Sequence, residues 1–334
     1  MKLSILDQSP ISSNKSAREA LYESMRLAQV GEMLGYTRFW MTEHHDLPGL
    51  ASSAPEVILG FIGSNTERIR LGSGATLLPH YKPFKVAEVF NTLATLFPGR
   101  IDLGLGRAPG GSAEATNALS ENFLQNVYSM PSLLKDLLHF LNNDFPADHQ
   151  FSKISPSPVP DELPETWLLG TSRKSALLAA EYGLAYTFGQ FMSDKDGTAI
   201  IQDYLDAYVP RKGGQVPQVM VTVTVFCAET TERADEISLS SFIWSLQKTK
   251  GEGQQGVPSI EEAKQYKLDA RERETLVNMR QNSIIGNPQD VKQRLMELQA
   301  SYQADEIMIN TVTYSAEDRI NSYKLIAAEL IQKD

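Results

Sequence analysis

Two adjacent histidines follow a short apolar segment early in the chain. In the segment FWMTEHHDLPG, residues 39–49, Glu43, His44 and His45 come directly after the apolar residues, and a proline–glycine turn follows. Imidazole is the side chain whose ordinary pKa lies closest to neutral pH. A histidine at the end of a buried strand is therefore a candidate for proton transfer. The alternative is a structural histidine that donates to a backbone carbonyl.

The histidine pattern also bears on metal binding. Because neighbouring residues of an extended chain point to opposite faces, we expect only one of His44 and His45 to face a site. Metal-dependent barrel hydrolases typically use a His-x-His pair, in which both rings lie on one side, and none occurs among the five histidines of this chain. We therefore predict no metal site, and a hydrolase that uses His44, His45 and His80 is kept only as an alternative.

A glycine-containing apolar segment is the second candidate region. In LGSGATLLPHYKPF, residues 71–84, Gly72, Gly74 and Ala75 lie inside a predicted strand. Glycine weakens a strand, so two of them indicate a bulge, the close approach of a flat ligand to the backbone, or close packing of neighbouring strands.

A third region is suited to an anion. The segment GLGRAPGG, residues 104–111, fails as a dinucleotide fingerprint because Pro109 stands where the third glycine is required. Arg107 remains, and its planar guanidinium suits a phosphate, although an ordinary ion pair at the end of a barrel is equally compatible with it.

The fourth region precedes a helix. Gly170, Thr171 and Ser172 stand just before a periodic apolar segment, which is the signature of a helix N-cap. A helix N-terminus presents free N–H groups to an anion, although capping alone explains the pattern as well. Together with Arg107, these residues predict a phosphate site beside the glycine-containing strand and a histidine. A flat, phosphate-bearing cofactor fits this combination.

Eight strand-then-helix units position these residues. Strands that alternate with helices indicate parallel pairing, and eight units at this length favour a closed (β/α)8 TIM barrel over a doubly wound sheet. We expect one domain over residues 1–334, of the α/β class, with insertions in the βα loops. The predicted strands are residues 3–6, 38–42, 69–78, 100–106, 166–170, 185–189, 218–228 and 305–312.

Three segments exceed a minimal barrel. Residues 107–130 and 144–165 are predicted as loops on either side of a helix. Residues 246–285 contain KTKGEGQQG, a polar, glycine-rich patch that is not expected to pack a core. Long irregular segments in compact domains are usually lids or disordered insertions, so this one is predicted to be a mobile lid or an insertion.

Composition excludes several classes of protein. The net charge is −10 and the pI about 5.1, which disfavours nucleic-acid binding. No apolar stretch is long enough to span a membrane, and the N-terminus makes a poor signal peptide. The single cysteine, Cys227, lies in an apolar strand and is predicted to be an inert core thiol. We expect a cytoplasmic protein.

Six segments, spread over nearly the whole chain, resemble the bacterial luciferase-like monooxygenase family. The resemblance is greatest to its single-chain, flavin-dependent branch rather than to the light-emitting enzyme. The six are LDQSPI, FWMTEHHDLPGLASSAPEV, IRLGSGATLLPHYKPFKVAEVFNTLATLFPGRIDLGLGRAPGG, WLLGTSRKSA, GNPQDV and DEIMINTVTYSAEDRINSYKLIAAEL.

The resemblance implies roles for particular residues. His44 matches the family's catalytic histidine near the flavin ring, and Glu43 matches its acidic neighbour. Members of the family commonly have a non-prolyl cis peptide under the ring, at the position of Gly74–Ala75. The matching cofactor-binding positions are Gly74, Ala75, Arg107, Gly170, Thr171 and Ser172.

The resemblance also implies a reaction. Reduced FMN, supplied by a separate NAD(P)H-dependent flavin reductase, reacts with dioxygen to give a flavin C4a-peroxide, which oxygenates a small organic substrate. A deazaflavin-dependent hydride-transfer oxidoreductase and a non-catalytic flavin-binding protein are the alternatives. Light emission and a long-chain aldehyde substrate do not transfer, because nothing in the sequence shows an aldehyde channel. A homodimer is expected, with the apolar second and third helices as the candidate interface.

Overall fold

Eight parallel strands close into a barrel. The structure is a computed structural model that describes residues 1–211 and 213–331. In this part of the chain the strands follow the order β10-β1-β2-β3-β5-β6-β7-β8, and β10 also pairs with β8, which closes the ring. The barrel strands are β1 (Lys2–Asp7), β2 (Arg38–Met41), β3 (Arg70–Ser73), β5 (Ile101–Gly106), β6 (Glu165–Gly170), β7 (Ala185–Gly189), β8 (Val219–Cys227) and β10 (Glu306–Asn310). The (β/α)8 barrel predicted from the sequence is confirmed.

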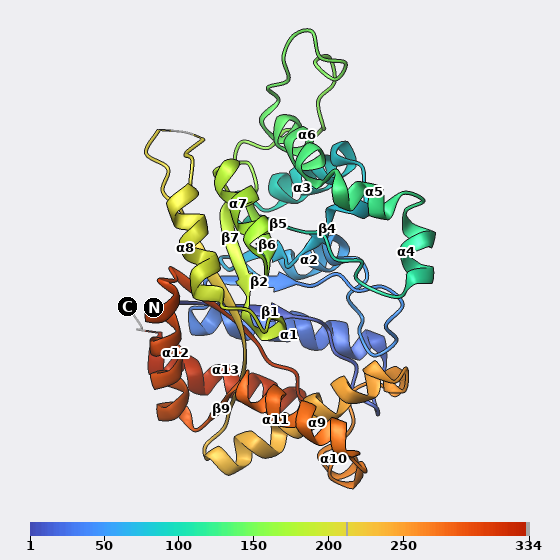
Figure 1. The fold of residues 1–334 in the computed structure, drawn as a ribbon, viewed down its shortest axis with the longest axis vertical. Coiled ribbons are helices and arrows are strands. Elements are labelled where there is room, and N and C mark those ends of the chain that lie inside the picture. Colours follow the sequence, from blue (N-terminus) through green and yellow to red (C-terminus); the bar gives the residue numbers. More distant parts are fainter. Residues whose placement is uncertain (212, 332–334) are drawn as a thin grey trace.

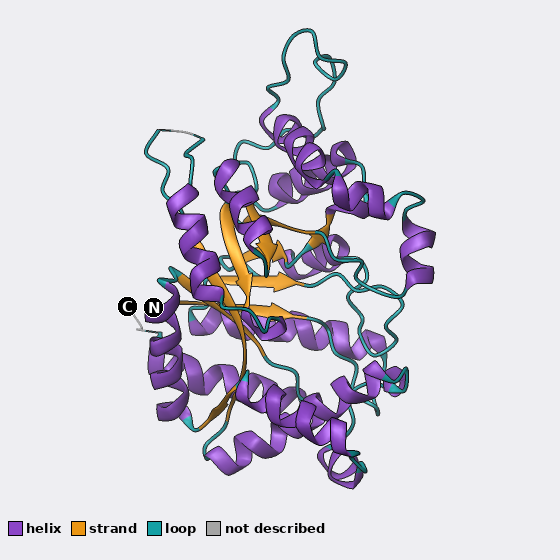
Figure 2. Ribbon diagram, viewed as in Figure 1, coloured by secondary structure: helices purple, strands orange, loops and turns teal. Residues whose placement is uncertain are grey.

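Helices surround these strands (Figure 2). They begin where the sequence offers caps: the Ser16 side chain and the Glu19 side chain each accept the other's backbone N–H at the start of α1. Proline stands in the first turn of α2, α3 and α12. The helices are α1 (Ala17–Leu34), α2 (Pro55–Gly63), α3 (Pro83–Leu96), α4 (Ala113–Leu119), α5 (Phe123–Tyr128), α6 (Met130–Asn142), α7 (Arg173–Glu181), α8 (Gly197–Ala207), α9 (Thr231–Thr249), α10 (Ile260–Gln265), α11 (Ala270–Gln281), α12 (Pro288–Tyr302) and α13 (Ala316–Leu330).

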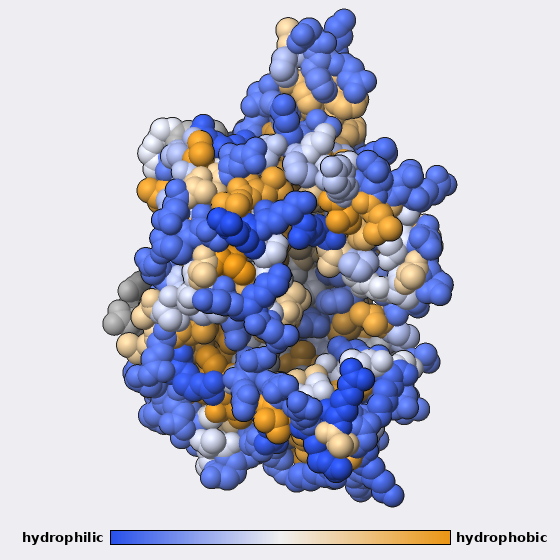
Figure 3. Space-filling view, in the orientation of Figure 1, coloured by the Kyte–Doolittle hydropathy of each residue, from blue (hydrophilic) through white to orange (hydrophobic). Residues whose placement is uncertain are grey.

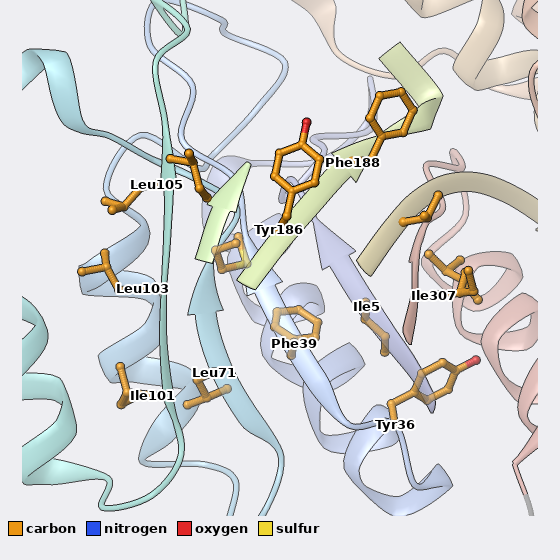
Figure 4. Packing of buried hydrophobic residues seen from close by; sticks show 14 of the residues in the cluster. Ile5, Tyr36, Phe39, Leu71, Ile101, Leu103, Leu105, Tyr186, Phe188 and Ile307 are labelled. Carbon is orange, nitrogen blue, oxygen red and sulfur yellow. The ribbon is translucent and has the colours of Figure 1, made fainter. Parts of the chain in front are cut away.

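The main hydrophobic core lies between the strands and the helices. Alternate strand residues, such as Ile101, Leu103 and Leu105 of β5, point outward from the barrel into this layer (Figure 4). Tyr186 and Phe188 do the same from β7 and are fully buried. The period of two along each strand therefore sends one set of side chains to the helices and the other set into the barrel.

The interior of the barrel is closed at the N-terminal ends of the strands. Arg38 Nη1 lies 2.8 Å from Asp102 Oδ1, and Arg38 Nε lies 3.2 Å from Glu306 Oε2. Above this buried ion network lies an apolar layer, and Trp40 Nε1 of that layer donates to Asp102 Oδ2 at 2.9 Å. The layer consists of Leu6, Trp40, Trp167, Met220 and Met308. These two layers fill the interior on the N-terminal side, and the described residues leave a cavity at the C-terminal ends of the strands.

Two segments in the first half of the chain differ from the sequence prediction. The strand expected over residues 69–78 is interrupted, because β3 ends at Ser73 and a short β4 (Thr76–Leu77) follows and pairs with β5. The Gly74–Ala75 peptide between them is cis, as the family resemblance implied. The loop expected over residues 107–130 contains α4 and α5. Ser112 caps α4, and the buried ring of Phe123 in α5 stacks on His80. Local capping and tertiary packing thus gave helices where no periodic pattern was evident.

Two insertions have different characters. Residues 144–164 carry no helix or strand, as expected, and their loop projects beyond α6 (Figure 1). The prediction that the glycine-rich patch packs no core is wrong. Trp244 Nε1 donates to the Gly253 carbonyl at 3.1 Å, and Val257 is buried with Leu50 and Trp244. The segment continues into α10 and α11, and a short β9 (Ile284–Gly286) then pairs with β8. Whether it moves stays a prediction.

The outer surface is mostly hydrophilic on the face shown in Figure 3, with small scattered hydrophobic groups. None of the helices described is long and apolar enough to cross a membrane. Cys227 is a fully buried free thiol, and burial raises its pKa to about 12. A protonated thiol in this position agrees with the inert core cysteine that the sequence predicts.

Candidate functional site

A cavity of about 950 Å³ opens at the C-terminal ends of the strands. It contains every candidate that the sequence singled out for catalysis or cofactor binding, so segments far apart in the chain meet there. These residues are Glu43, His44, Gly74, Ala75, Arg107, Gly170, Thr171 and Ser172. The volume of the cavity lies near the upper end of the roughly 300–1,000 Å³ that is usual for ligand pockets. The barrel geometry accounts for the convergence, since each residue stands at or just beyond a strand end.

His44 faces this cavity. Its Nδ1 lies 2.9 Å from Thr42 Oγ1, and its backbone N–H donates to the Ser52 carbonyl at 3.0 Å. No hydrogen bond joins its Nε2 to the described residues. Burial of the ring, the positive charge of Lys248 and the neighbouring His45 lower the pKa of His44 to about 4. The ring is therefore neutral at pH 7, in contrast to the near-neutral pKa on which the sequence argument relied.

His45 turns the other way, as the alternation of an extended chain predicts. Its Nε2 lies 2.8 Å from Glu43 Oε1, and its ring contacts that of His80 edge-on at 5.8 Å between centroids. His80 Nε2 in turn lies 2.9 Å from the Pro109 carbonyl oxygen. His44 thus faces the cavity alone, and the three histidines of the hydrolase alternative do not converge. Among the described residues no group of three or more histidine, cysteine or acidic side chains is placed to hold a metal ion.

Glu43 holds this corner of the site together. Its buried carboxylate accepts hydrogen bonds from Tyr81 Oη at 2.6 Å and from the Leu77 N–H at 3.0 Å, in addition to its contact with His45. Burial and the Glu43 charge raise the pKa of Tyr81, which keeps the phenol a donor. Because all three contacts tie Glu43 to the protein, the geometry indicates a positioning residue for the loop that carries His44.

The Glu43→Gln variant should therefore lose stability. We expect about 1–3 kcal/mol, because the amide nitrogen would face donors where a carboxylate oxygen now accepts. Urea unfolding measures the loss. The matched variant Tyr81→Phe, which removes one of the three donors, should lose about 1 kcal/mol. If Glu43→Gln is as stable as the wild type, the carboxylate does not hold the loop.

Arg107 and the start of α7 meet at the side of the cavity formed by β5 and β6. Arg107 Nη2 lies 3.4 Å from Ser172 Oγ. Ser172 caps α7, since its Oγ accepts from the Ser175 N–H at 3.3 Å. In the described part of the chain Arg107 forms no ion pair with a carboxylate, so the ordinary ion pair considered from the sequence is not observed there. A guanidinium and a helix N-terminus directed at the same space form a site suited to a phosphate.

Close packing explains the glycines of the interrupted strand. A Cβ on Gly72 would lie 2.5 Å from Trp40 Nε1, and a Cβ on Gly74 would lie 2.7 Å from Leu6 Cδ1. A Cβ on Gly170 would meet Ser175 Oγ at 2.3 Å. Of the alternatives left open by the sequence, packing within the barrel is sufficient for Gly72 and Gly74, even though Gly74 and Ala75 also line the cavity.

Several lining residues escaped the sequence analysis. Thr222 and Thr224 of β8 alternate with the valines that face the helices, so their period of two was a usable signal. Thr187 Oγ1 and Asn310 Oδ1 are buried at the cavity without a hydrogen-bond partner among the described residues. Lys248 of α9 is the most consequential of the group, because it adds a positive charge beside His44.

The effect of Lys248 on His44 gives a direct test of the site's electrostatics. In the Lys248→Met variant the pKa of His44 should rise above about 4, since one of the charges that oppose protonation is gone. It should stay below its ordinary value of 6.5, because burial and His45 remain. NMR titration of labelled histidines measures the shift. The Lys195→Met variant, at the rim of the same cavity, should leave it unchanged. An unshifted His44 in Lys248→Met would contradict the arrangement.

The fold and site define a (β/α)8 barrel with a large, partly cationic cavity at the C-terminal ends of its strands. Residues 1–304 match the model of the luciferase-like monooxygenase family. The chain belongs to this family, in agreement with the resemblance found in the sequence.

Two relatives and one solved structure illustrate the similarity. The chain is 41% identical over 326 residues to the uncharacterized protein YwcH of Bacillus subtilis, with 98% of each chain covered. It is 35% identical over 329 residues to the N-acetyl-S-alkylcysteine monooxygenase of the same organism, covering 98% of this chain and 97% of that one. The crystal structure of apo-MsnO8 superposes with a TM-score of 0.85 at 30% identity, over 98% of both chains.

More distant structures share the fold alone. The oxygenating constituent of 3,6-diketocamphane monooxygenase, solved in complex with FMN, has a TM-score of 0.73 at 20% identity, over 99% of this chain and 97% of that one. An F420-dependent secondary alcohol dehydrogenase has a TM-score of 0.71 at 13% identity, over 99% of both chains. The same barrel therefore serves enzymes that use two different cofactors.

Proposed function

We propose that this protein is an FMN-dependent monooxygenase, which uses reduced FMN and dioxygen to oxygenate a small organic substrate. One observation carries the proposal within a family of monooxygenases: an Arg107 guanidinium and a helix N-terminus share a large cavity with the His44 imidazole. A separate NAD(P)H-dependent flavin reductase would supply the reduced cofactor.

The residues fit the cofactor. Arg107, Ser172 and the first N–H groups of α7 would hold the phosphate, because they present donors and because Arg107 forms no ion pair within the described chain. Gly74, Ala75 and His44 line the part of the cavity left for the ring system. The unpaired Thr187 and Asn310 oxygens are available to a polar ligand on the barrel floor.

The chemistry balances with the groups named. Reduced FMN would supply two electrons, by the C4a route that the resemblance implies, so that one oxygen atom of dioxygen passes to the substrate and the other leaves as water. His44 would form a hydrogen bond to the reacting group through Nε2 and would accept a proton only when an anion nearby raises its pKa. The segment of α9, α10 and α11 would keep water from the site, which limits loss of oxygen as hydrogen peroxide.

Rapid mixing tests the proposal. Protein loaded anaerobically with reduced FMN is mixed with dioxygen, and the flavin absorbance is followed. We expect a transient species, distinct from reduced and oxidised flavin, that persists longer than with free FMN. Re-oxidation in one phase at the rate of free FMN would instead favour a flavin-binding protein without catalysis. The relative that acts on N-acetyl-S-alkylcysteines makes these thioethers the first compounds to screen.

The affinities for FMN and for the deazaflavin distinguish the proposed function from the deazaflavin-dependent alternative. It draws support from the F420-dependent dehydrogenase that shares the fold. Anaerobic spectral titrations with FMN and with the deazaflavin give the two dissociation constants. We expect tighter binding of reduced FMN, and tighter deazaflavin binding with hydride transfer to a substrate would replace the proposed function.

A further inference from the structure

The wall of the cavity away from Arg107 consists of two polar helical stripes. From α9, Ser241, Trp244, Ser245 and Lys248 line the cavity at helical spacing, together with the apolar Phe242. A second stripe comes from Thr275, Asn278 and Met279 of α11, and it continues into Asn282 and Ser283 directly after the helix. In Figure 1 both helices lie together on one side of the barrel. Hydroxyls, amides and one ammonium therefore dominate a wall that is interrupted by only a few apolar side chains.

Lys248 is the charged member of this wall. Its Nζ lies 3.7 Å from the centroid of the Trp244 ring, and its stem packs against Gly253, where a Cβ would lie 2.6 Å from Lys248 Cγ. Within the described residues its ammonium forms neither an ion pair nor a hydrogen bond. Burial lowers its pKa to about 8, so most molecules carry the charge at pH 7. A half-buried ammonium held over an indole, without a carboxylate, is placed to receive an anion from the cavity.

Arg107 and Lys248 are on different sides of the cavity mouth, and Lys195 is a third cation at its rim. Arg107 follows β5, next to the β6–α7 turn. Trp244, one turn before Lys248, packs with Leu50 and Val312 from the loops after β2 and β10. In the ring of strands β2 and β10 flank β1, whereas β5 and β6 lie on the far side. One phosphate held by Arg107 thus leaves Lys248 for a second anionic group, next to His44.

We propose that Lys248 binds the carboxylate of the organic substrate, and that this enzyme therefore acts on small, polar carboxylic acids. The proposal rests on the proposed function, since it assigns the substrate class of the same site. The acid would be held by the ammonium, its polar groups would meet the hydroxyls and amides of α9 and α11, and its reacting atom would extend toward His44. A long apolar aldehyde would find few partners on this wall.

Binding of matched acids and amides tests Lys248. Two acid–amide pairs are titrated calorimetrically into the FMN-loaded protein. They are N-acetyl-S-methylcysteine with its primary amide, and pentanoate with pentanamide. We expect at least one acid to bind roughly 10- to 100-fold more tightly than its amide, as a charge-assisted hydrogen bond provides. Lys248→Met should abolish this preference while affecting amide binding little. Lys248→Arg should retain part of it, and Lys195→Met at the rim should retain all of it.

Each outcome decides the assignment. The proposal is overturned if neither acid is preferred over its amide, or if Lys248→Met keeps the preference. It is also overturned if Lys248→Met weakens reduced FMN binding and leaves the acid preference intact, because the ammonium would then serve the flavin. The acid titrations are repeated on the apo protein. Failure of FMN to bind at all would sink the proposed function, whereas the apo titrations would still report on Lys248.

Discussion

Replacement of His44 by alanine is expected to lower coupled oxygenation at least about 100-fold and to leave FMN affinity nearly unchanged. The ring lines the cavity, and within the described residues its one side-chain hydrogen-bond partner is the Thr42 hydroxyl, which contacts Nδ1. The phosphate site proposed at Arg107 lies on other strands, so we expect binding not to depend on the imidazole. The coupling is measured as the amount of product formed per dioxygen consumed. The hydrogen peroxide released is measured in parallel.

Two further variants sharpen this result. Thr42→Val removes the partner of Nδ1 and keeps the ring, so its loss of coupling should be smaller than that of His44→Ala. His139→Ala removes a histidine on α6 that pairs with Asp144 away from the cavity, and should behave as the wild type. If the His44→Ala variant couples oxygen transfer as well as the wild type, the imidazole has no part in the reaction.

The placement of the site could be predicted from the sequence because barrel chemistry is tied to strand ends. Once eight strand–helix units are recognised, Glu43, His44 and Arg107 must lie at one end of the barrel, and the structure places them around one cavity. The opposed directions of His44 and His45 followed from the alternation of an extended chain. These predictions used only local periodicity and the topology that it implies.

What the sequence did not reveal depends on tertiary contacts. The low pKa of His44 arises from burial and from Lys248, which lies about 200 residues away in a helix whose stripe of cavity residues was not recognised. The glycine-rich patch folds because Trp244 Nε1 donates to the Gly253 carbonyl and because the adjoining Val257 is buried against Trp244 and against Leu50, which comes from a distant segment. Composition alone made that patch resemble a solvated insertion. In both cases the sequence did not indicate which distant segments contact each other in the folded protein.

The Arg107→Gln variant is expected to bind FMN roughly 10- to 100-fold more weakly, while its affinity for riboflavin should change little. The Arg107 guanidinium lies next to the N-cap of α7, so both can contact one phosphate. FMN carries that phosphate and riboflavin does not. Ser172→Ala should reduce FMN affinity less, because the free N–H groups of the helix remain. Fluorescence titration with both flavins separates a phosphate contact from a general loss of the pocket.

The neighbouring arginine supplies the control for this comparison. Arg173, the first residue of α7, is exposed and its Nε lies 3.0 Å from Asp203 Oδ2, so its charge is paired away from the cavity. Arg173→Gln removes the same charge near the same helix end and should leave both flavin affinities close to wild type. If Arg107→Gln weakens riboflavin and FMN equally, the guanidinium supports the ring pocket. The phosphate would then bind elsewhere, because a lost phosphate contact affects only the ligand that carries the phosphate.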